Sequence, residues 1–323
     1  MPTASSPLVI GFAQVAPVWL NRAATLAKVV AAIHRAADQG ASVVGFGECL
    51  VPGYPFWLEL TDGARFNDPV QKEMHAEYLR QAVCIEDDHL RPVQEACAER
   101  RINAVLGILE KPLDRGESAY ACCVVVGAKG DVLSAHRKLM PTYEERLAWS
   151  IGDGHGLRTH RIGEFTLGAL NCWENWMPLA RAALYGQGED LHVAIWPGSL
   201  RNTDDLTRFI AKESRSYVLS VSGLMRLSDF PEATPHRAAI LAGHRGGDFL
   251  ADGGSCLAAP DGSWVIPPVV GEECVRVAAI DHAFVRRERQ NFDPSGHYSR
   301  PDVLRLSVNR ERQGSVDLID YEP

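Results

Sequence analysis

Apolar residues follow two different periods along this chain. Short apolar runs such as 8–15 and 191–196 are bounded by turn residues, a pattern typical of buried strands. Segment 21–40 instead repeats its apolar residues every three or four positions, which predicts a helix that begins after Asn21 and ends before Gly40. Runs of the two kinds alternate along the chain, which favours an α/β sheet protein with its helices outside.

Ten strands and five helices are predicted in this way. The strands are Leu8–Val15, Ser42–Glu48, Ile102–Glu110, Tyr120–Gly127, Val132–Lys138, a run from about Thr166 to Cys172, Leu191–Trp196, Val218–Met225, Ser255–Ala259 and Cys274–Ile280. The helices are 21–40, Pro69–Gln81, Asp88–Arg101, Met177 to about Gln187, and Thr203–Ser216. Three strands between 102 and 138 follow one another without a helix, so the sheets are expected to be mixed and to form one domain.

Composition narrows the possible partners. With 323 residues, 46% of them hydrophobic, the chain can bury a large core. The formal net charge is −8 and no basic run stands out, which argues against nucleic acid as the main partner. The most apolar stretch, Ala119–Ala128, is too short to cross a bilayer, so no membrane partner is expected.

The first residues of the chain and its cysteines favour a cytoplasmic protein. Met1–Pro7 contains no basic segment followed by an apolar one, so no secretory signal is expected there. Eight cysteines are scattered without a C-x-x-C pair, which is neither a zinc pattern nor a disulfide framework. Free thiols in a reducing compartment are the simplest interpretation.

The segment Thr166–Leu179 places a cysteine where a buried strand gives way to a helix. Backbone N–H groups at a helix start favour negative charge, so they are expected to lower the pKa of Cys172 and to stabilise an oxyanion. A buried structural cysteine is the commoner alternative, and this segment alone does not decide between the two.

Two other strand ends carry reactive side chains: Glu48 and Lys138. Sites in open α/β sheets gather where strands end. Each residue alone would be an ordinary surface charge. Together with Cys172 they have a chemical logic, because a thiolate attacks, a carboxylate moves protons and an ammonium stabilises developing charge.

Four segments around these residues resemble the nitrilase superfamily of carbon–nitrogen hydrolases, and within it the true nitrilase branch. They read GECLVPGYP (47–55), HRKLMPTYEER (136–146), NCWEN (171–175) and GHYSRPD (296–302), and they occur in the family's order. The resemblance implies an α-β-β-α sandwich of two stacked mixed sheets, formed by residues 1–300, with 301–323 as a C-terminal arm.

The resemblance also implies residue roles. Cys172 would be the nucleophile, Glu48 the general base and Lys138 the charge stabiliser, with Glu145 as a second active-site glutamate. The substrate would be a small organic nitrile, hydrolysed to the acid and ammonia through a thioimidate and a thioester, with no cofactor. Family members also form dimers through the helix after the nucleophile, here near Pro178–Gln187, so a homo-oligomer is expected, with the C-terminal arm crossing onto a partner.

Two departures from the family pattern affect these expectations. Gly47 stands where proline often precedes the first glutamate, and glycine frees the backbone that holds Glu48. The sequence after His297 is short for a family member that builds long spirals, which favours small oligomers.

Glu145 has two interpretations. Thr142 and Glu145 fit a capping box, with threonine at the cap and glutamate three positions later, and the sequence alone favours this structural role. The resemblance favours a catalytic role, in which the carboxylate orients Lys138 or transfers protons.

Four aromatic residues are candidates for an apolar substrate pocket: Tyr54, Trp57, Trp173 and Trp196. Tyr54 is the strongest of them because it lies in a rigid Pro-Gly-Tyr-Pro loop. For Trp57 and Trp196 an ordinary core position is at least as favoured. His155 and His160 are interpreted as loop histidines, and no metal site is predicted.

Two rival functions remain open. An amidase or carbamoylase could use the same cysteine, glutamate and lysine. A non-catalytic scaffold could share the fold, although such a protein has no chemical reason to keep all three reactive residues.

Overall fold

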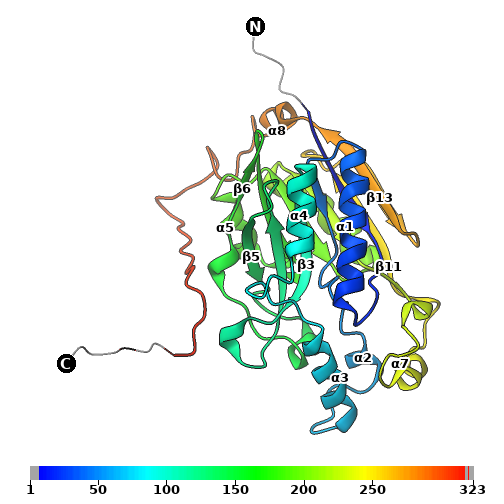
Figure 1. The fold of residues 1–323 in the computed structure, drawn as a ribbon. Helices are drawn as coiled ribbons and strands as arrows, with labels where there is room; N and C mark the ends of the chain where they lie inside the picture. The colour runs from blue at the N-terminus through cyan, green and yellow to red at the C-terminus, as the bar shows by residue number, and fades with distance from the viewer. Residues whose placement is uncertain (1–6, 317–318, 320–323) are drawn as a thin grey trace.

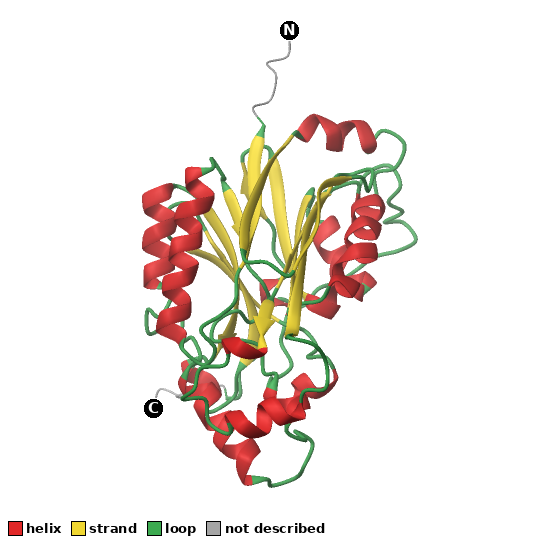
Figure 2. Ribbon diagram, turned by 90° about the vertical axis from the view of Figure 1, so that its right-hand side faces the viewer, coloured by secondary structure: helices red, strands yellow, loops and turns green. Residues whose placement is uncertain are grey.

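The chain folds into four layers, in which two stacked sheets are enclosed by helices on both sides (Figures 1 and 2). This computed structural model describes residues 7–316 and 319. The four layers confirm the α-β-β-α sandwich that the resemblance implied. The predicted absence of a secretory signal concerns residues that, Pro7 aside, lie outside the described residues.

The first sheet has six strands in the order β13-β1-β2-β3-β4-β5. Its strands β1, β2 and β3 are parallel, and all its other pairings are antiparallel. The bounds are β1 Leu8–Gln14, β2 Val43–Gly45, β3 Asn103–Glu110, β4 Tyr120–Val126, β5 Val132–Arg137 and β13 Cys274–Ile280.

The second sheet has seven strands in the order β10-β11-β9-β8-β7-β6, with β12 also paired to β11. Strands β7, β8 and β9 are parallel, and the remaining pairs are antiparallel. The bounds are β6 His160–Ile162, β7 Phe165–Asn171, β8 Leu191–Trp196, β9 Tyr217–Ser222, β10 Leu224–Arg226, β11 Phe249–Ala258 and β12 Trp264–Val270. Both sheets are mixed, as predicted.

Alternate side chains of the strands separate two kinds of core. On β8, Val193 and Ile195 face the first sheet, whereas Ala194 and Trp196 face the outer helices. Helices α1 (Arg22–Asp38) and α4 (Arg91–Arg100) cover the first sheet, and α5 (Pro178–Tyr185) and α6 (Leu200–Ser214) cover the second. Strands buried on both faces explain why the sequence shows continuous apolar runs.

Short helices make up most of the remaining connections. They are α2 (Trp57–Leu60), α3 (Pro69–Arg80), α7 (Arg237–Gly243) and α8 (His282–Glu288), with 3-10 turns η1 Leu113–Arg115, η2 Tyr143–Leu147, η3 Gly154–Gly156, η4 Cys172–Trp176 and η5 Leu227–Asp229. No helix within the described part of the chain is long and apolar enough to span a membrane.

Several predicted elements differ from the structure. The expected strand 218–225 is divided at Gly223, where a Cβ would lie 2.1 Å from the Pro197 carbonyl oxygen. Strand β12 was not predicted, because Pro267 and Pro268 disfavour a strand interior. Among the described strands β12 pairs with β11 alone, so it is an edge strand, and proline is tolerated on edge strands. The helix expected from Met177 begins at Pro178 and is preceded by η4.

The C-terminal arm contains neither helix nor strand over residues 304–316. Its side chains bind its own chain beside β5: Arg312 pairs with Asp153 at 3.0 Å and donates to the Ala135 carbonyl at 2.9 Å. The Gln313 N–H also donates to Asp153. Residues 317–318 and 320–323 of the predicted arm lie outside the described residues, and its crossing to a partner stays a prediction.

One glycine allows the loop after β2 to lie directly on β3. A Cβ at Gly107 would be 2.2 Å from the Gly47 carbonyl oxygen, 2.5 Å from the Cys49 nitrogen and 2.7 Å from Glu48 Cα. These contacts are with backbone atoms, which cannot move aside cheaply. The position of Glu48 therefore depends on the missing side chain at Gly107.

We expect Gly107→Ala to destabilise the fold by roughly 1–3 kcal/mol, as overpacking of a buried position does. The free energy of unfolding from urea titration measures the effect. Gly247→Ala is the control, because its Cβ would meet no atom within 4 Å, and it is expected to stay within about 0.5 kcal/mol of the parent. Equal stability of the two variants would contradict the close approach.

Candidate active site

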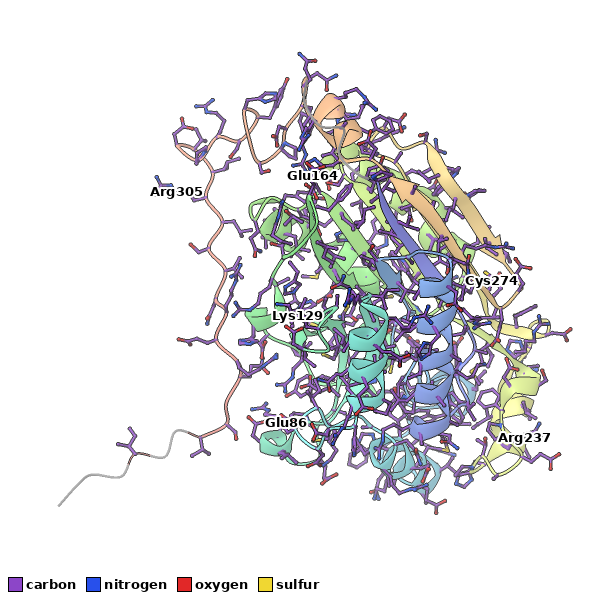
Figure 3. All side chains as sticks on the ribbon, turned by 45° about the horizontal axis from the view of Figure 1, so that its top comes forward. Glu86, Lys129, Glu164, Arg237, Cys274 and Arg305 are labelled. Carbon is purple, nitrogen blue, oxygen red and sulfur yellow. The ribbon has the colours of Figure 1, made fainter. Side chains whose placement is uncertain are left out.

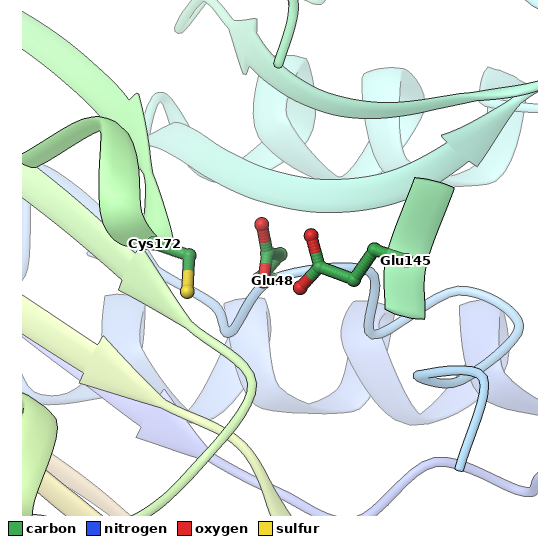
Figure 4. Close-up of side chains that lie close together, drawn as sticks. All are labelled: Glu48, Glu145 and Cys172. Atoms are coloured by element: carbon green, nitrogen blue, oxygen red, sulfur yellow. The ribbon is translucent and has the colours of Figure 1, made fainter. Parts of the chain in front are cut away.

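The three reactive strand ends of the sequence meet between the two sheets. Glu48 lies in the loop after β2, Lys138 directly follows β5, and Cys172 directly follows β7. Glu145, from η2, completes the group. All four side chains are buried, with 1–3% of each residue exposed. One oxygen of each carboxylate and the sulfur of Cys172 lie within 4.8 Å of one another, and the three side chains point toward a common centre (Figure 4).

The Lys138 ammonium lies between the two carboxylates. Its Nζ is 2.9 Å from Glu48 Oε1 and 2.6 Å from Glu145 Oε2. The Nζ atom also lies 5.3 Å from the centre of the Trp149 ring. The backbone N–H of Lys138 donates to the Ala121 carbonyl of β4, so the lysine is attached to the sheet.

The two carboxylates differ in their hydrogen bonds. Glu145 accepts three: from Tyr54 OH at 2.8 Å, from Lys138 Nζ at 2.6 Å and from the Thr142 N–H at 2.6 Å. Glu48 contacts Lys138 at ion-pair distance, but neither of its oxygens accepts a hydrogen bond from any described residue. Glu145 is therefore held by its partners, whereas Glu48 has free lone pairs.

Both sequence interpretations of Glu145 have a counterpart in the structure. The Thr142 contact is the bond of a capping box at the start of η2. The same oxygen, Oε2, also binds the ammonium of Lys138. Capping and lysine binding are thus performed together by one carboxylate.

Burial and like charge determine the protonation of the group. Burial raises the pKa of the Glu48 carboxyl to about 8; the positive charge of Lys138 opposes this shift and Glu145 adds to it. The pKa of Lys138 is raised: burial alone would lower it, but the negative charges around the ammonium outweigh burial.

The thiol of Cys172 behaves differently from the sequence expectation. Burial, followed by the charge of Glu48, raises its pKa well above the usual range, whereas Lys138 and the Trp173 N–H lower it by less. The lowering that was expected from backbone N–H groups is present through Trp173, but the net shift of the pKa is upward, because complete burial of the sulfur is the larger effect. The resting nucleophile is a thiol and needs a base.

Cys172 has an unusual backbone. Its φ is +45°, in the left-handed region that side chains rarely adopt, at the junction of β7 and η4. Such a conformation costs of the order of 1–3 kcal/mol and persists where surrounding contacts enforce it. A sharp bend of this kind places the side chain at the sheet edge, facing Glu48.

Glu174 connects the nucleophile turn to the strand that carries the lysine. Its carboxylate accepts from the Asn171 N–H at 2.8 Å and from the Leu139 N–H, and it pairs with His136 at 3.0 Å. Burial would raise the pKa of Glu174, but His136 and these N–H groups lower it overall. One buried carboxylate thus binds Asn171, just before Cys172, and His136 and Leu139, on either side of Lys138. The sequence analysis missed this role of Glu174.

The cluster of ligand atoms does not fit a metal ion. Glu48, Glu145 and Cys172 are the only group of three potential ligands found among the described residues. The ammonium of Lys138 already occupies the space between the two carboxylates. A second cation there would meet it at close range, which is unfavourable.

The four aromatic candidates occupy different places. Tyr54 binds Glu145 and packs edge-on against Trp149, with 5.5 Å between ring centres. Trp173 is 53% exposed, on the turn of the nucleophile. Trp196 is fully buried in the core cluster that contains Cys172. Trp57 is fully buried among Trp19 and Tyr78, in a core that also contains Cys49, and its role in substrate binding stays a prediction.

A small cavity beside Glu48 is lined mainly by apolar residues. Its walls are Pro17, Gly47, Glu48, Leu50, Gly53, Tyr54, Phe56, Pro197, Gly223, Leu224 and Met225. Phe56 and Met225 were not predicted: Phe56 lies in a loop, where apolar residues give no periodic signal, and Met225 lies on the short strand β10, whose side facing the cavity the sequence did not indicate. Gly47 itself lies in a tight space, because a Cβ added at this position would be 3.1 Å from the Trp196 carbonyl oxygen. The Glu48 N–H donates to the same oxygen at 3.0 Å. The backbone at Glu48 is held by this bond rather than freed by the glycine.

The two histidines noted in the sequence do not belong to the group of four reactive residues. His155, in η3, contacts the Arg310 carbonyl of the arm at 3.1 Å through Nδ1. A loop position was predicted for His160, but the residue belongs to β6. Its Nε2 lies 2.7 Å from Ser134 Oγ. Both are occupied by structural contacts.

Proteins of similar sequence point to the same chemistry as the residues. The chain is 34% identical over 318 residues to "Nitrilase 2" from an unknown prokaryotic organism, covering 96% of this chain and 97% of that protein. It is 33% identical to an aliphatic nitrilase of Sinorhizobium fredii (94% and 96% covered) and 32% identical to an arylacetonitrilase of Aspergillus kawachii (97% and 94% covered).

Comparison of folds and of family sequence patterns gives the final assignment. A carbon–nitrogen hydrolase from Helicobacter pylori G27 superposes with a TM-score of 0.69 at 17% identity, over 92% of this chain and 97% of that one, a likeness of fold alone. The sequence profile of the carbon–nitrogen hydrolases matches residues 9–290. The protein therefore belongs to the carbon–nitrogen hydrolase family.

Proposed function

We propose that this protein is a nitrilase, which hydrolyses organic nitriles to carboxylic acids and ammonia. The observation that carries the proposal is the buried group of Cys172, Glu48, Lys138 and Glu145, in which the Glu48 carboxylate is paired with Lys138 but has no further hydrogen-bond donor among the described residues. The nitrilases among its relatives cover nearly the whole chain and support the proposal. They act on different nitriles by name, so they do not select a substrate class.

The first half of the reaction joins the thiol to the nitrile carbon. Glu48 takes the proton of Cys172, since its lone pairs are free, and delivers it to the nitrile nitrogen as sulfur attacks carbon. The product is a thioimidate. The ammonium of Lys138 stabilises the negative charge that develops on nitrogen, in a site where burial strengthens the interaction.

The second half consumes two waters. Glu48 accepts a proton from the first water as it adds to the thioimidate, and the tetrahedral intermediate expels ammonia to leave a thioester. A second water then releases the acid and restores the thiol. If the tetrahedral intermediate expels the thiolate instead, an amide forms, so a minor amide product is expected.

An amidase on the same residues remains the second candidate. Its reaction enters the same path at the tetrahedral intermediate, which forms when the thiol adds to the amide carbonyl and then expels ammonia to leave the thioester, so the geometry of the four residues suits both. The Cys-Trp-Glu sequence at 172–174 and the similarity to nitrilases favour the nitrile. A non-catalytic scaffold would have no use for a carboxylate held with unbound oxygens beside a thiol.

A homo-oligomer is part of the proposal. Trp173, Trp176, Met177 and Leu179 are 37–68% exposed on η4 and the start of α5, and Phe209 of α6, which contacts Arg181, is 52% exposed. An apolar patch of this extent is typical of an interaction surface. The eight cysteines are free, which supports a reducing, cytoplasmic location.

Cys172→Ala is expected to abolish ammonia release from every nitrile and leave the fold intact. Ammonia is measured with a panel of aliphatic, aromatic and arylacetonitriles, each beside its matching amide, and intact mass detects the covalent adduct in the parent protein. Cys122→Ala, at a buried position away from the site, should keep turnover. Release from amides but not nitriles would favour the amidase, and more than trace activity of Cys172→Ala would refute the mechanism.

Turnover is expected to rise with pH through about 8. The active site needs one proton shared between Cys172 and Glu48; below the pKa of Glu48, near 8, both are protonated and no base is available. We therefore expect kcat/KM to increase with pH, since loss of that proton makes the base available. The measurement is kcat/KM between pH 6 and 9.5 on a nitrile without ionisable groups. A profile that is flat over this range would contradict the role of Glu48.

Glu145→Gln is expected to give a folded protein with kcat lowered by about 10²–10⁴-fold. Glutamine can still accept the Thr142 N–H, but it carries no charge to pair with Lys138. Loss of a cap alone would cost roughly 0.5–2 kcal/mol of stability and leave the chemical step nearly unchanged. Glu144→Gln, next to it in η2, is the control and should be near normal. Near-normal turnover of Glu145→Gln would return this residue to a purely structural role.

Light scattering at micromolar concentration is expected to show a dimer or a larger assembly. Leu179→Lys places a charge in the exposed apolar patch and should shift the assembly toward the monomer, since an unpaired charge in an interface is costly. Leu113→Lys is a matched control, because Leu113 is 66% exposed and Leu179 is 68% exposed, but it lies on η1. A monomeric parent protein would show the oligomer proposal to be wrong.

A further inference from the structure

A chain of buried polar side chains runs from the nucleophile into the outer face of the second sheet. Asn175 Nδ2 donates to the Cys172 carbonyl at 2.8 Å. Asn175 Oδ1 lies 2.7 Å from His192 Nε2, and His192 Nδ1 lies 2.8 Å from Glu189 Oε1. All three side chains are completely buried. None of them belongs to the group of four reactive residues.

The direction of these hydrogen bonds is determined by the carbonyl at one end. A carbonyl oxygen can only accept, so the amide nitrogen of Asn175 faces Cys172 and its oxygen faces His192. That oxygen also can only accept, so His192 Nε2 must carry a hydrogen. Glu189 holds the opposite side of the ring through Nδ1. The orientation of the Asn175 amide thus depends on both residues behind it.

The chain acts on the strained part of the nucleophile turn. The Asn175 amide contacts the carbonyl of Cys172 and, at 3.4 Å, that of Leu170, on both sides of the bend. Cys172 has a φ of +45°, a conformation that needs enforcement by its neighbours. The amide provides such enforcement without touching the reacting atoms.

Holding the Cys172 carbonyl also orients the next N–H. The carbonyl of Cys172 and the N–H of Trp173 belong to one rigid trans peptide plane and point in opposite directions. With the carbonyl fixed toward Asn175, the Trp173 N–H faces the other way, on the side of the Cys172 thiol, whose charged form it favours. The same N–H is placed to meet negative charge during attack.

The sheet is adapted to contain this chain. His192 on β8 is the register partner of Gly168 on β7. A Cβ at Gly168 would lie 2.1 Å from Glu189 Oε1, so glycine leaves the space that the carboxylate occupies. Apolar residues in these positions would avoid the cost of burying a carboxylate and an imidazole. A polar chain kept at that cost, and ending on the nucleophile, indicates a role there.

We propose that Asn175, His192 and Glu189 are positioning residues that fix the Cys172–Trp173 peptide, so that its N–H points at the nucleophilic sulfur. This inference rests on the proposed function for Cys172. It assigns a task to three side chains that touch neither the nitrile nor the four reactive residues' side chains.

The test compares Asn175→Asp and His192→Phe with two matched variants. Asn175→Asp replaces only the amide NH₂ by oxygen, so the donor to Cys172 is lost. Glu189→Gln keeps the chain, because glutamine can donate to Nδ1 and leave the hydrogen on Nε2. Thr207→Val removes a buried hydroxyl of α6 elsewhere on the outer face of the second sheet, where it contacts Ser220, and controls for general destabilisation.

Two readouts separate this inference from the proposed function. The first is the rate of alkylation of Cys172 by iodoacetamide between pH 6 and 10, measured by peptide mass analysis, which needs no nitrile turnover. The second is kcat and KM on the best nitrile. In Asn175→Asp and His192→Phe we expect alkylation at pH 7.5 and kcat to fall about 5- to 30-fold, as for loss of one buried hydrogen bond, with KM little changed. Glu189→Gln and Thr207→Val should stay close to the parent protein.

The outcomes decide between positioning and mere stability. Alkylation could be slower in Asn175→Asp and His192→Phe while the parent protein shows no nitrile turnover at all. That result would support the positioning role and would refute only the nitrilase assignment. A lowered melting temperature with parental alkylation and kcat would overturn the inference. If His192→Phe does not fold, Asn175→Asp carries the test, since its side chain has the same size; parental alkylation by folded Asn175→Asp would likewise overturn it.

Discussion

The buried ammonium of Lys138 is the constraint on which the site depends. A charge with 1% of its residue exposed is very costly unless opposite charge surrounds it, and Glu48 and Glu145 lie 2.9 and 2.6 Å away. One cation between two carboxylates leaves an excess of negative charge in a dry space. The fold must therefore stabilise one carboxylate by other means and let the other approach neutrality.

The structure divides these two tasks between the glutamates. Glu145 accepts hydrogen bonds from three donors, two of which are the Tyr54 hydroxyl and the Thr142 backbone N–H. Glu48 has no such donors, and its pKa is raised to about 8. A carboxyl whose pKa lies near the working pH can both take and give protons, which the successive proton transfers of nitrile hydrolysis require. The difference between the two roles follows from hydrogen bonding and not from residue type.

Much of this arrangement could be predicted from the sequence. The strands before Cys172 and Glu48 are continuous apolar runs, the strand before Lys138 is partly apolar, and the ends of strands are where sites form. The sequence also indicated both interpretations of Glu145, but only the structure shows that one oxygen performs capping and lysine binding together. A spacing of three residues suggests a local bond; it cannot show that a third residue shares it.

Other features depend on contacts between distant segments and gave no signal in the sequence. Gly107 matters because the loop after β2 lies on it, and Trp149 because its ring faces Lys138. The thiol pKa was expected to be lowered, since residue types suggested nearby donors, whereas its direction is decided by burial, which only the packed fold determines. Likewise, the aromatic residues Trp57 and Trp196 look alike in the sequence, yet they lie in separate cores.

The position of the nucleophile relative to the lysine raises a further problem, because the two residues come from different sheets. Two successive side chains of the turn address it from opposite directions. Glu174 reaches the first sheet, where it binds His136 and the Leu139 N–H on either side of Lys138. Asn175 reaches the second sheet through His192. A turn anchored to both sheets cannot shift with either one alone, so the distance between sulfur and ammonium is set by the stacking of the whole sandwich. This explains how a loop residue with a strained backbone can be held as firmly as a residue within a strand.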